Sequence, residues 1–287
     1  MPETFPNAQS ENIVIYISGT GASKNFSTLM TNCLPNQHLL DTGQCFPLYW
    51  YEQSQEPDDK QGRLFNDAGE AANSVPEIKY KRRSAISDAA LARFQSQYND
   101  RRISKEDIFY YVYGVLSAPE YRERFGDDVK RILARVPFAR DFWAFSIAGR
   151  ELGELHVNYE NVKPWPVKLK NTPLSPGTNG ENSMHIVEKM KIVNIDGQKA
   201  IRYNENITVT GIPSEAWEYI INGKSALEWI VERYQDAVDK NSGLRNDCNA
   251  WGRERGNPRY PLDLIERVTR VSVETVKILK RLPELGV

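Results

Sequence analysis

A glycine-bearing stretch near the N-terminus has residue types that can bind phosphate. ISGTGASK at residues 17–24 follows a predicted strand, and Asp41 lies at a spacing suited to a ribose contact. The dinucleotide-binding fingerprint requires a third glycine where Lys24 stands, and Pro35 comes too soon for a full crossover helix. We therefore interpret this stretch as a turn between a strand and a loop.

A second stretch, Gly223-Lys224-Ser225, ends like a phosphate-binding Walker loop. The first glycine of that loop would fall at position 218, which holds Glu218, and a predicted helix precedes the stretch where a strand is needed. We interpret these residues as a helix C-cap followed by an N-cap.

The sequence GNPRYP at residues 256–261 differs by one residue from NPPY. With NPPY, amino-group DNA methyltransferases hold a base that has been taken out of the duplex. Arg259 replaces the second proline, which changes the restraint on the backbone. The segment follows a long polar loop, and no S-adenosylmethionine-binding loop precedes it. We interpret Asn257-Pro258 as a turn before the last helix, and we predict no catalytic residue in this chain.

Cysteine and histidine residues are too few and too widely spaced to predict a metal site. They are Cys33, Cys45, Cys248, His38, His156 and His185. The odd number of separated cysteines suits a reducing cytoplasm. The sequence has no run of about 20 apolar residues that could span a bilayer, and its first residues do not resemble a signal peptide. We expect a cytoplasmic protein with no cofactor bound by this chain.

Charge is balanced overall but segregated locally. The 287 residues carry a net charge of −1, with 40% hydrophobic and 26% charged residues, as in ordinary globular proteins. Residues 52–77 contain seven acidic and two basic residues, which predicts a solvated loop. Residues 79–102 contain seven basic and two acidic residues, a local net charge of +5. Any attraction to a polyanion must therefore come from local patches.

The pattern of apolar residues predicts a mixed α/β (α+β) chain with short strands and several helices. Strands are expected at 12–18, 38–41, 45–52, 185–193 and 206–210. Helices are expected at 86–100, 104–116, 120–133 (interrupted at Gly126), 138–156, 214–222, 225–238 and 261–282.

The helix at 104–116 has the clearest signal, whereas the segment at 261–282 is β-branched and is assigned to a helix because its length favours a helix over a strand. In the helix at 104–116, Ser104 and Asp107 resemble a capping box, and aromatic residues on every side predict that it is buried nearly all round. The C-terminal helix carries one apolar stripe, which consists of Ile265, Val268, Ser272, Val276 and Leu279. The proline-rich stretch near 161–182 is expected to be a linker or binding loop, and it is a candidate boundary between two lobes.

Long blocks of the chain resemble the C-terminal segment of type ISP restriction–modification enzymes. They are QCFPLYWYE (44–52), DIFYYVYGVLSAPEYRERF (107–125), ARDFWAFSIAGRELGELHVNYE (139–160), ITVTGIPSEAWEYIINGKSALEWIVERYQ (207–235), SGLRNDCNAWGRERGNPRY (242–260) and the helix that follows. In that family this region is the target recognition domain of a single polypeptide that also carries a nuclease, an ATP-driven translocase, a coupler and a methyltransferase.

The resemblance implies that residues 12–287 are a target recognition domain and that residues 1–11 are a trailing linker from an upstream methyltransferase region. It implies double-stranded DNA and the upstream methyltransferase, coupler and helicase domains as partners. ATP, Mg²⁺ and S-adenosylmethionine would serve those other domains.

A domain of this kind needs basic residues that hold phosphates and basic or amide residues that read bases. The sequence offers ten candidates for DNA contacts, which are Lys81, Arg82, Arg83, Arg101, Arg102, Lys168, Lys170, Arg253, Arg255 and Arg259. Arg259 has a second interpretation as a structural residue of the turn. The tyrosine-rich helix at 104–116 is expected to belong to the core, although exposed tyrosines can stack on bases.

Two other classes of function stay open at this point. The chain could be a scaffold that couples the methyltransferase to the translocase, or a nucleotide-dependent enzyme, which only GTGASK suggests.

Overall fold

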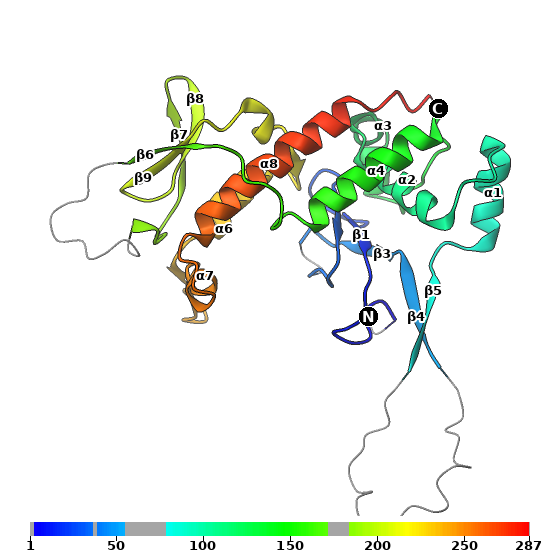
Figure 1. Ribbon diagram of the computed structural model, residues 1–287, viewed down its shortest axis with the longest axis horizontal. Helices are drawn as coiled ribbons and strands as arrows, with labels where there is room; N and C mark the ends of the chain where they lie inside the picture. Colours follow the sequence, from blue (N-terminus) through cyan, green and yellow to red (C-terminus); the bar gives the residue numbers. More distant parts are fainter. Residues whose placement is uncertain (1–2, 37–38, 55–78, 172–183, 287) are drawn as a thin grey trace, which may run out of the picture.

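The computed structural model describes residues 3–36, 39–54, 79–171 and 184–286, which form an α+β fold with two separate hydrophobic cores (Figure 1). The first core takes most of its residues from the chain before residue 158, and the second takes its residues from the chain after it. The predicted mixture of short strands and helices is confirmed. In the described part of the chain no helix is long and apolar enough to cross a membrane.

The first core begins with a three-stranded antiparallel sheet in the order β2-β1-β3. Its strands are β1 (Val14–Ile17), β2 (Thr28–Thr31) and β3 (Gln44–Pro47). All four residues of β1 are buried, so this strand is covered on both faces. This fits its β-branched sequence, because a strand buried on both faces has no solvated side to need polar residues.

Two helices pack beside this sheet, and their backbones lie unusually close to each other. These are α2 (Lys105–Ser117) and α4 (Phe142–Val157). A Cβ atom built on Gly114 would lie 2.1 Å from the carbonyl oxygen of Phe145, and one on Gly149 would lie 1.9 Å from that of Tyr110. Glycine at both positions therefore lets the two backbones approach each other. The capping box of Ser104 and Asp107 and the nearly complete burial of α2 are confirmed.

Three further elements border the first core. A hairpin of β4 (Tyr49–Gln53) and β5 (Tyr80–Ser84) projects away from it and leads into α1 (Asp88–Tyr98). The helix α3 (Pro119–Val129) runs through Gly126 without the predicted interruption, and it begins after Ala118 with no side-chain cap. The predicted loop at 52–77 lies outside the described residues except for its first three, of which Glu52 and Gln53 end β4.

The second core lies between an antiparallel sheet and two helices. The sheet has the order β6-β9-β8-β7, with β6 (Lys168–Asn171), β9 (Ile207–Thr210), β8 (Gln198–Arg202) and β7 (Lys191–Ile195). The helices are α6 (Ala226–Arg233) and α8 (Tyr260–Lys280). The short 3₁₀ helix η2 (Ser214–Trp217) and the hairpin of β10 (Ile220–Ile221) with β11 (Lys224–Ser225) precede α6 in the chain. The small hairpin of β12 (Ala237–Val238) with β13 (Arg245–Asn246) follows α6.

The long helix α8 joins the two cores. Leu262, Ile265 and Val273 belong to the second core, whereas Ile278 belongs to the first. Figure 1 shows α8 running from the four-stranded sheet toward α3 and α4. A hydrogen bond of 2.7 Å from the Asn222 amide to Ser27 Oγ links the same two parts of the fold. The two-lobe division near 161–182 stays a prediction, and residues 172–183 lie outside the described part of the chain.

The structure corrects three local predictions. Leu39 to Asp41 form a turn and not a strand, and Asp41 has a φ of 60°. Residues 185–190 precede the strand that was expected to include them, since β7 starts at Lys191. The segment SEAWEYIIN is not one helix, because after η2 the chain enters the β10–β11 hairpin.

Asn222 and Gly223 form the turn of that hairpin, with φ values of 49° and 85°. Asn-Gly is the favoured pair for a two-residue hairpin turn that needs positive φ twice. The same residue pair can end a helix, and this ambiguity made the local interpretation wrong. Ser225 does cap the next helix, with Glu228 completing a capping box.

Candidate nucleic-acid interface

The strand β5 presents Lys81, Arg82 and Arg83 as three consecutive exposed residues. The guanidinium of Arg82 lies over the ring of Tyr49, 4.4 Å from its centroid, and Arg83 Nε donates to Glu52 Oε2 at 3.2 Å. Among the described residues, Lys81 and Arg82 have no carboxylate partner. These two side chains are therefore available to a phosphate without the loss of an ion pair.

Arg101 and Arg102 lie in the turn between α1 and α2. Arg102 donates to both carboxylate oxygens of Asp100, at 2.9 and 2.7 Å, and this pairing holds the pKa of Asp100 well below its usual range. Trp143 Nε1 also donates to Asp100 at 3.0 Å. Arg102 is thus part of a local network, whereas Arg101 has no carboxylate partner in the described part of the chain.

Lys168 and Lys170 lie on β6, an exposed strand at the edge of the four-stranded sheet. Lys170 Nζ lies 3.6 Å from Asp196 Oδ2, with both groups mainly exposed. Such a surface pair contributes little to stability and exchanges readily for another anion. Lys168 has no carboxylate neighbour in the ranges that the structure describes.

Arg253 and Arg255 lie at the end of the short helix α7 (Ala250–Glu254). Arg253 pairs with Asp247, which lowers the pKa of that carboxyl. Arg255 lies 3.2 Å from the ring centroid of Trp251, whose side chain is 48% exposed. The carboxylate and the ring restrict the two guanidiniums to defined orientations, which reduces the entropy cost of a directed contact.

Arg259 is held differently from the other candidates. It pairs with Asp263 and Glu266 on the first turns of α8, and Glu266 is buried. Asn257 Oδ1 accepts from the Arg259 amide at 3.1 Å, and Asn257 Nδ2 donates to Asp263 at 2.9 Å. GNPRY is thus a turn that starts α8, as the sequence predicts, and Arg259 fixes it to the helix.

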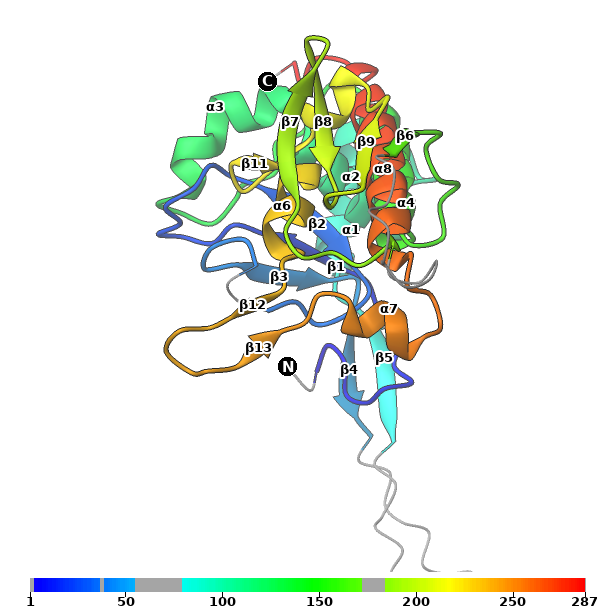
Figure 2. The ribbon, with the colours of Figure 1, turned by 90° about the vertical axis from the view of Figure 1, so that its left-hand side faces the viewer.

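The structure brings some of the ten candidates to one side of the molecule. The β4–β5 hairpin and α7 both project toward the lower side of Figure 1, and the view in Figure 2 agrees. The segments that carry Lys81, Arg82, Arg83, Arg253 and Arg255 therefore lie on this side, which we call the lower face. The edge strand β6 lies near the top of both views, and α1 lies at the end of the molecule far from the four-stranded sheet.

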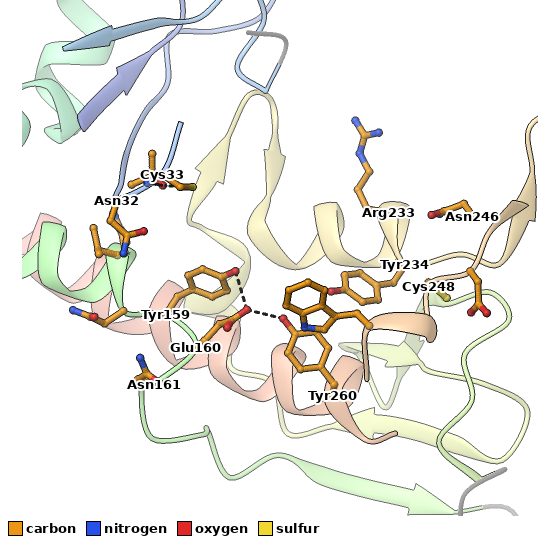
Figure 3. Close-up of a pocket in the computed structure, with 16 residues that line it drawn as sticks. Asn32, Cys33, Tyr159, Glu160, Asn161, Arg233, Tyr234, Asn246, Cys248 and Tyr260 are labelled. Atoms are coloured by element: carbon orange, nitrogen blue, oxygen red, sulfur yellow. Dashed lines mark hydrogen bonds between the residues drawn. The ribbon is translucent and has the colours of Figure 1, made fainter. Parts of the chain in front are cut away.

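Sequence reasoning did not single out a cleft next to the lower face. Figure 3 shows this cleft, with a volume of about 720 Å³, between the end of α4, the segment after β2, and the region from α6 to α8. Tyr159 and Tyr260 both donate to Glu160 Oε1, at 3.1 and 2.6 Å. Only the adjacent Tyr159-Glu160 pair was visible in the sequence, because Tyr260 is 100 residues away.

His156 lies at the inner edge of the cleft in a network of hydrogen bonds. Its Nδ1 is 2.6 Å from Tyr113 Oη and its Nε2 is 2.8 Å from Thr275 Oγ1. Burial lowers the pKa of His156 to about 4, so the imidazole is neutral at pH 7. In the described residues no group of three or more His, Cys, Asp or Glu side chains could hold a metal ion.

This fold occurs in proteins whose structures contain DNA or a DNA mimic. The description Type ISP C-terminal specificity domain fits residues 1–264, and the chain belongs to that family. The search of curated proteins found no match.

Three solved structures resemble the whole chain. They are a nuclease-deletion mutant of the Type ISP restriction-modification enzyme LlaGI in complex with a DNA substrate mimic (31% identity, TM-score 0.74), the ATP-dependent Type ISP restriction-modification enzyme LlaBIII bound to DNA (30%, 0.79), and a DrdV–DNA complex (34%, 0.77). The likeness covers 100% of this chain but only 22%, 17% and 26% of those chains, respectively.

Proposed function

We propose that this chain recognises double-stranded DNA in a sequence-specific way, as the specificity domain of a type ISP restriction–modification enzyme. The observation that carries the proposal is the likeness, over 100% of the chain and at 30–34% identity, to three proteins whose structures contain DNA or a DNA mimic. The basic residues of the lower face support the same function. Because the chain as a whole carries a net charge of −1, attraction to DNA must come from a local group of basic residues such as this one.

The contacts on the lower face suggest a division of labour. Lys81 and Arg82 are exposed and have no carboxylate partner among the described residues, so they suit phosphate contacts that carry no sequence information. Arg253 and Arg255 are oriented by Asp247 and Trp251, and an oriented guanidinium suits bidentate contact with a guanine edge. Arg259 acts in this scheme as the residue that positions α7 relative to α8.

The chemistry would belong to other parts of the enzyme. In this scheme the chain directs methylation, ATP-dependent translocation and cleavage to a site, while upstream domains bind ATP, Mg²⁺ and S-adenosylmethionine. The chain itself neither cuts, hydrolyses nor methylates. The structure of GNPRY supports this scheme, because Asn257 is engaged by Arg259 and Asp263 and forms part of a turn.

The test measures binding of the intact enzyme to its cognate duplex and to a scrambled duplex at several salt concentrations. Arg253→Ala should cost about 1–3 kcal/mol on the cognate site and little on the scrambled one. Lys277→Ala, at an exposed position on α8, is the control and should change neither affinity. If charge reversal of Lys81, Arg82, Arg83, Arg253 and Arg255 together leaves both affinities unchanged, the chain is not the DNA reader, and the coupling-scaffold function replaces this proposal.

A further inference from the structure

The cleft beside the lower face has a pre-formed polar wall. Glu160 Oε1 accepts from the hydroxyls of Tyr159 and Tyr260, so the three side chains hold one another in place. Burial, with the neighbouring Glu160 carboxylate, raises the pKa of Tyr159 to about 12 and raises that of Tyr260 further, so both hydroxyls keep their protons at neutral pH. Both bonds use Oε1, and in the described structure no donor contacts Oε2.

The same cleft has an aromatic side and an amide-lined rim. The ring centroids of Trp251 and Tyr260 lie 6.4 Å apart. The guanidinium of Arg255 lies over the ring of Trp251. Asn158 and Asn161 are exposed at the rim, and Figure 3 shows Asn32 on the opposite side from Asn246. Amide groups both donate and accept hydrogen bonds, as the edges of a nucleobase do.

A cation without a carboxylate partner lies at the mouth of the cleft. Arg233 is exposed, packs 5.3 Å from the ring centroid of Trp229, and has no ion pair within the part of the chain that the structure describes. The cleft therefore combines an acceptor, aromatic rings and a cation, the groups that would contact the amino edge, the face and the phosphate of one nucleotide. Its volume of about 720 Å³ is in the range of small-molecule sites.

We propose that this cleft binds a single unstacked nucleobase that carries an exocyclic amino group, adenine or cytosine, with the amino group donating to Glu160 Oε2. The ring would lie against Tyr260 and Trp251, and Arg233 would contact the attached phosphate. The inference rests on the proposed function for its DNA source, because the cleft opens beside the lower face. A base of this kind can come from a DNA strand or from a free nucleotide, and the experiment separates the two.

The experiment uses the 287-residue chain and labelled duplexes that carry one bulged nucleotide. Duplexes with bulged adenine or cytosine should bind roughly tenfold more tightly than the fully paired duplex or one with bulged thymine. Glu160→Gln keeps an oxygen for the two tyrosines but replaces the acceptor Oε2 with an NH₂ donor. The variant should therefore reverse the preference toward thymine, whose edge presents carbonyl oxygens, and a merely structural role of Glu160 would not reverse it.

Glu154→Gln is the matched control, because Glu154 is an exposed carboxylate of α4 that does not line the cleft. Cooperative unfolding of each variant checks that it is folded. A second arm titrates AMP and TMP into the chain. AMP binding that Glu160→Gln abolishes, without any preference among bulged duplexes, would support the nucleobase site with a free nucleotide as its source.

Equal affinity for all bulged and paired duplexes, together with no binding of AMP, would overturn the inference while leaving the proposed function intact. Charge reversal of Lys81 and Arg82 tests the DNA contacts of the lower face by themselves. If this variant loses all duplex binding but still binds AMP in preference to TMP, the nucleobase site is supported as a site distinct from those contacts. A preference for adenine and cytosine that Glu160→Gln leaves unchanged would also overturn it.

Discussion

Gly149 on α4 faces Tyr110 on α2 so closely that a Cβ atom on the glycine would lie 1.9 Å from the tyrosine carbonyl oxygen. Gly114 on α2 meets the Phe145 carbonyl oxygen in the same way from the other helix. The atoms in the way belong to the backbone and cannot rotate aside. The close crossing of these two helices therefore depends on two glycines, each of which faces the backbone of the opposite helix.

Gly149→Ala should destabilise the fold by about 1–3 kcal/mol, because the overlap must be relieved by moving α4 away from α2. Gly126→Ala on α3 is the control, since its Cβ would come no nearer than 3.9 Å to another atom. That change should stabilise by up to about 1 kcal/mol through helix propensity. Urea unfolding of both variants measures the difference, and equal stability of the two would contradict the steric explanation.

Arg82→Ala should weaken binding to all DNA sequences about equally. Its guanidinium lies over Tyr49 and has no carboxylate partner in the described structure, so DNA can use it without breaking an ion pair. The slope of log affinity against log salt should fall in magnitude by roughly one for this single residue. Fluorescence anisotropy over a salt series measures the slope. A loss confined to one DNA sequence would show instead that Arg82 reads a base.

Arg259→Ala should lower stability and leave the salt slope unchanged. Removing the guanidinium leaves Asp263 and the buried Glu266 as neighbouring carboxylates without their shared cation. We expect a cost of about 1–3 kcal/mol, below the 3–5 kcal/mol typical of a fully buried pair because Arg259 is partly exposed. Arg259→Lys should recover little, since one ammonium cannot reproduce the two-carboxylate geometry. A changed salt slope with normal stability would make Arg259 a DNA contact.

His156 should make the fold more sensitive to acid between about pH 6.5 and pH 4. Burial lowers the pKa of His156 to about 4 in the folded state, and the unfolded value is about 6.5. The unfolded chain therefore binds the proton first, so the contribution is complete above pH 6.5 and is lost as the pH falls toward 4. The full loss is on the order of 3 kcal/mol.

Urea unfolding at pH 7 and pH 4.5 tests this expectation against His156→Gln. The glutamine retains hydrogen-bonding groups for Tyr113 and Thr275 but does not titrate. The difference in stability between the two proteins should shrink, or change sign, as the pH falls. A constant difference at every pH would show that His156 is not the group that titrates.

Local hydrogen bonds and apolar periodicity within a few residues determined several elements from the sequence alone. Ser104 and Asp107 cap α2 because both partners lie within one turn. The apolar stripe of α8 and the turn at Asn257-Pro258 could also be predicted, because each depends on residues close together in the sequence. The basic residues of β5 were visible as a charge cluster, and the family resemblance rested on long blocks in the correct order.

Contacts between residues far apart in the chain decided the rest. Asn222-Gly223 suits both a helix end and a hairpin turn, and in the fold the backbone amide of Asn222 donates to Ser27 Oγ, 195 residues away, a contact that the local sequence does not reveal. The cleft likewise requires Glu160 and Tyr260 to meet across 100 residues. Long-range packing selects among conformations that are nearly equal in local free energy, so the hairpin turn and the cleft could be identified only from the tertiary structure. Capped helices and amphipathic stripes could be predicted because the residues that form them are close together in the sequence.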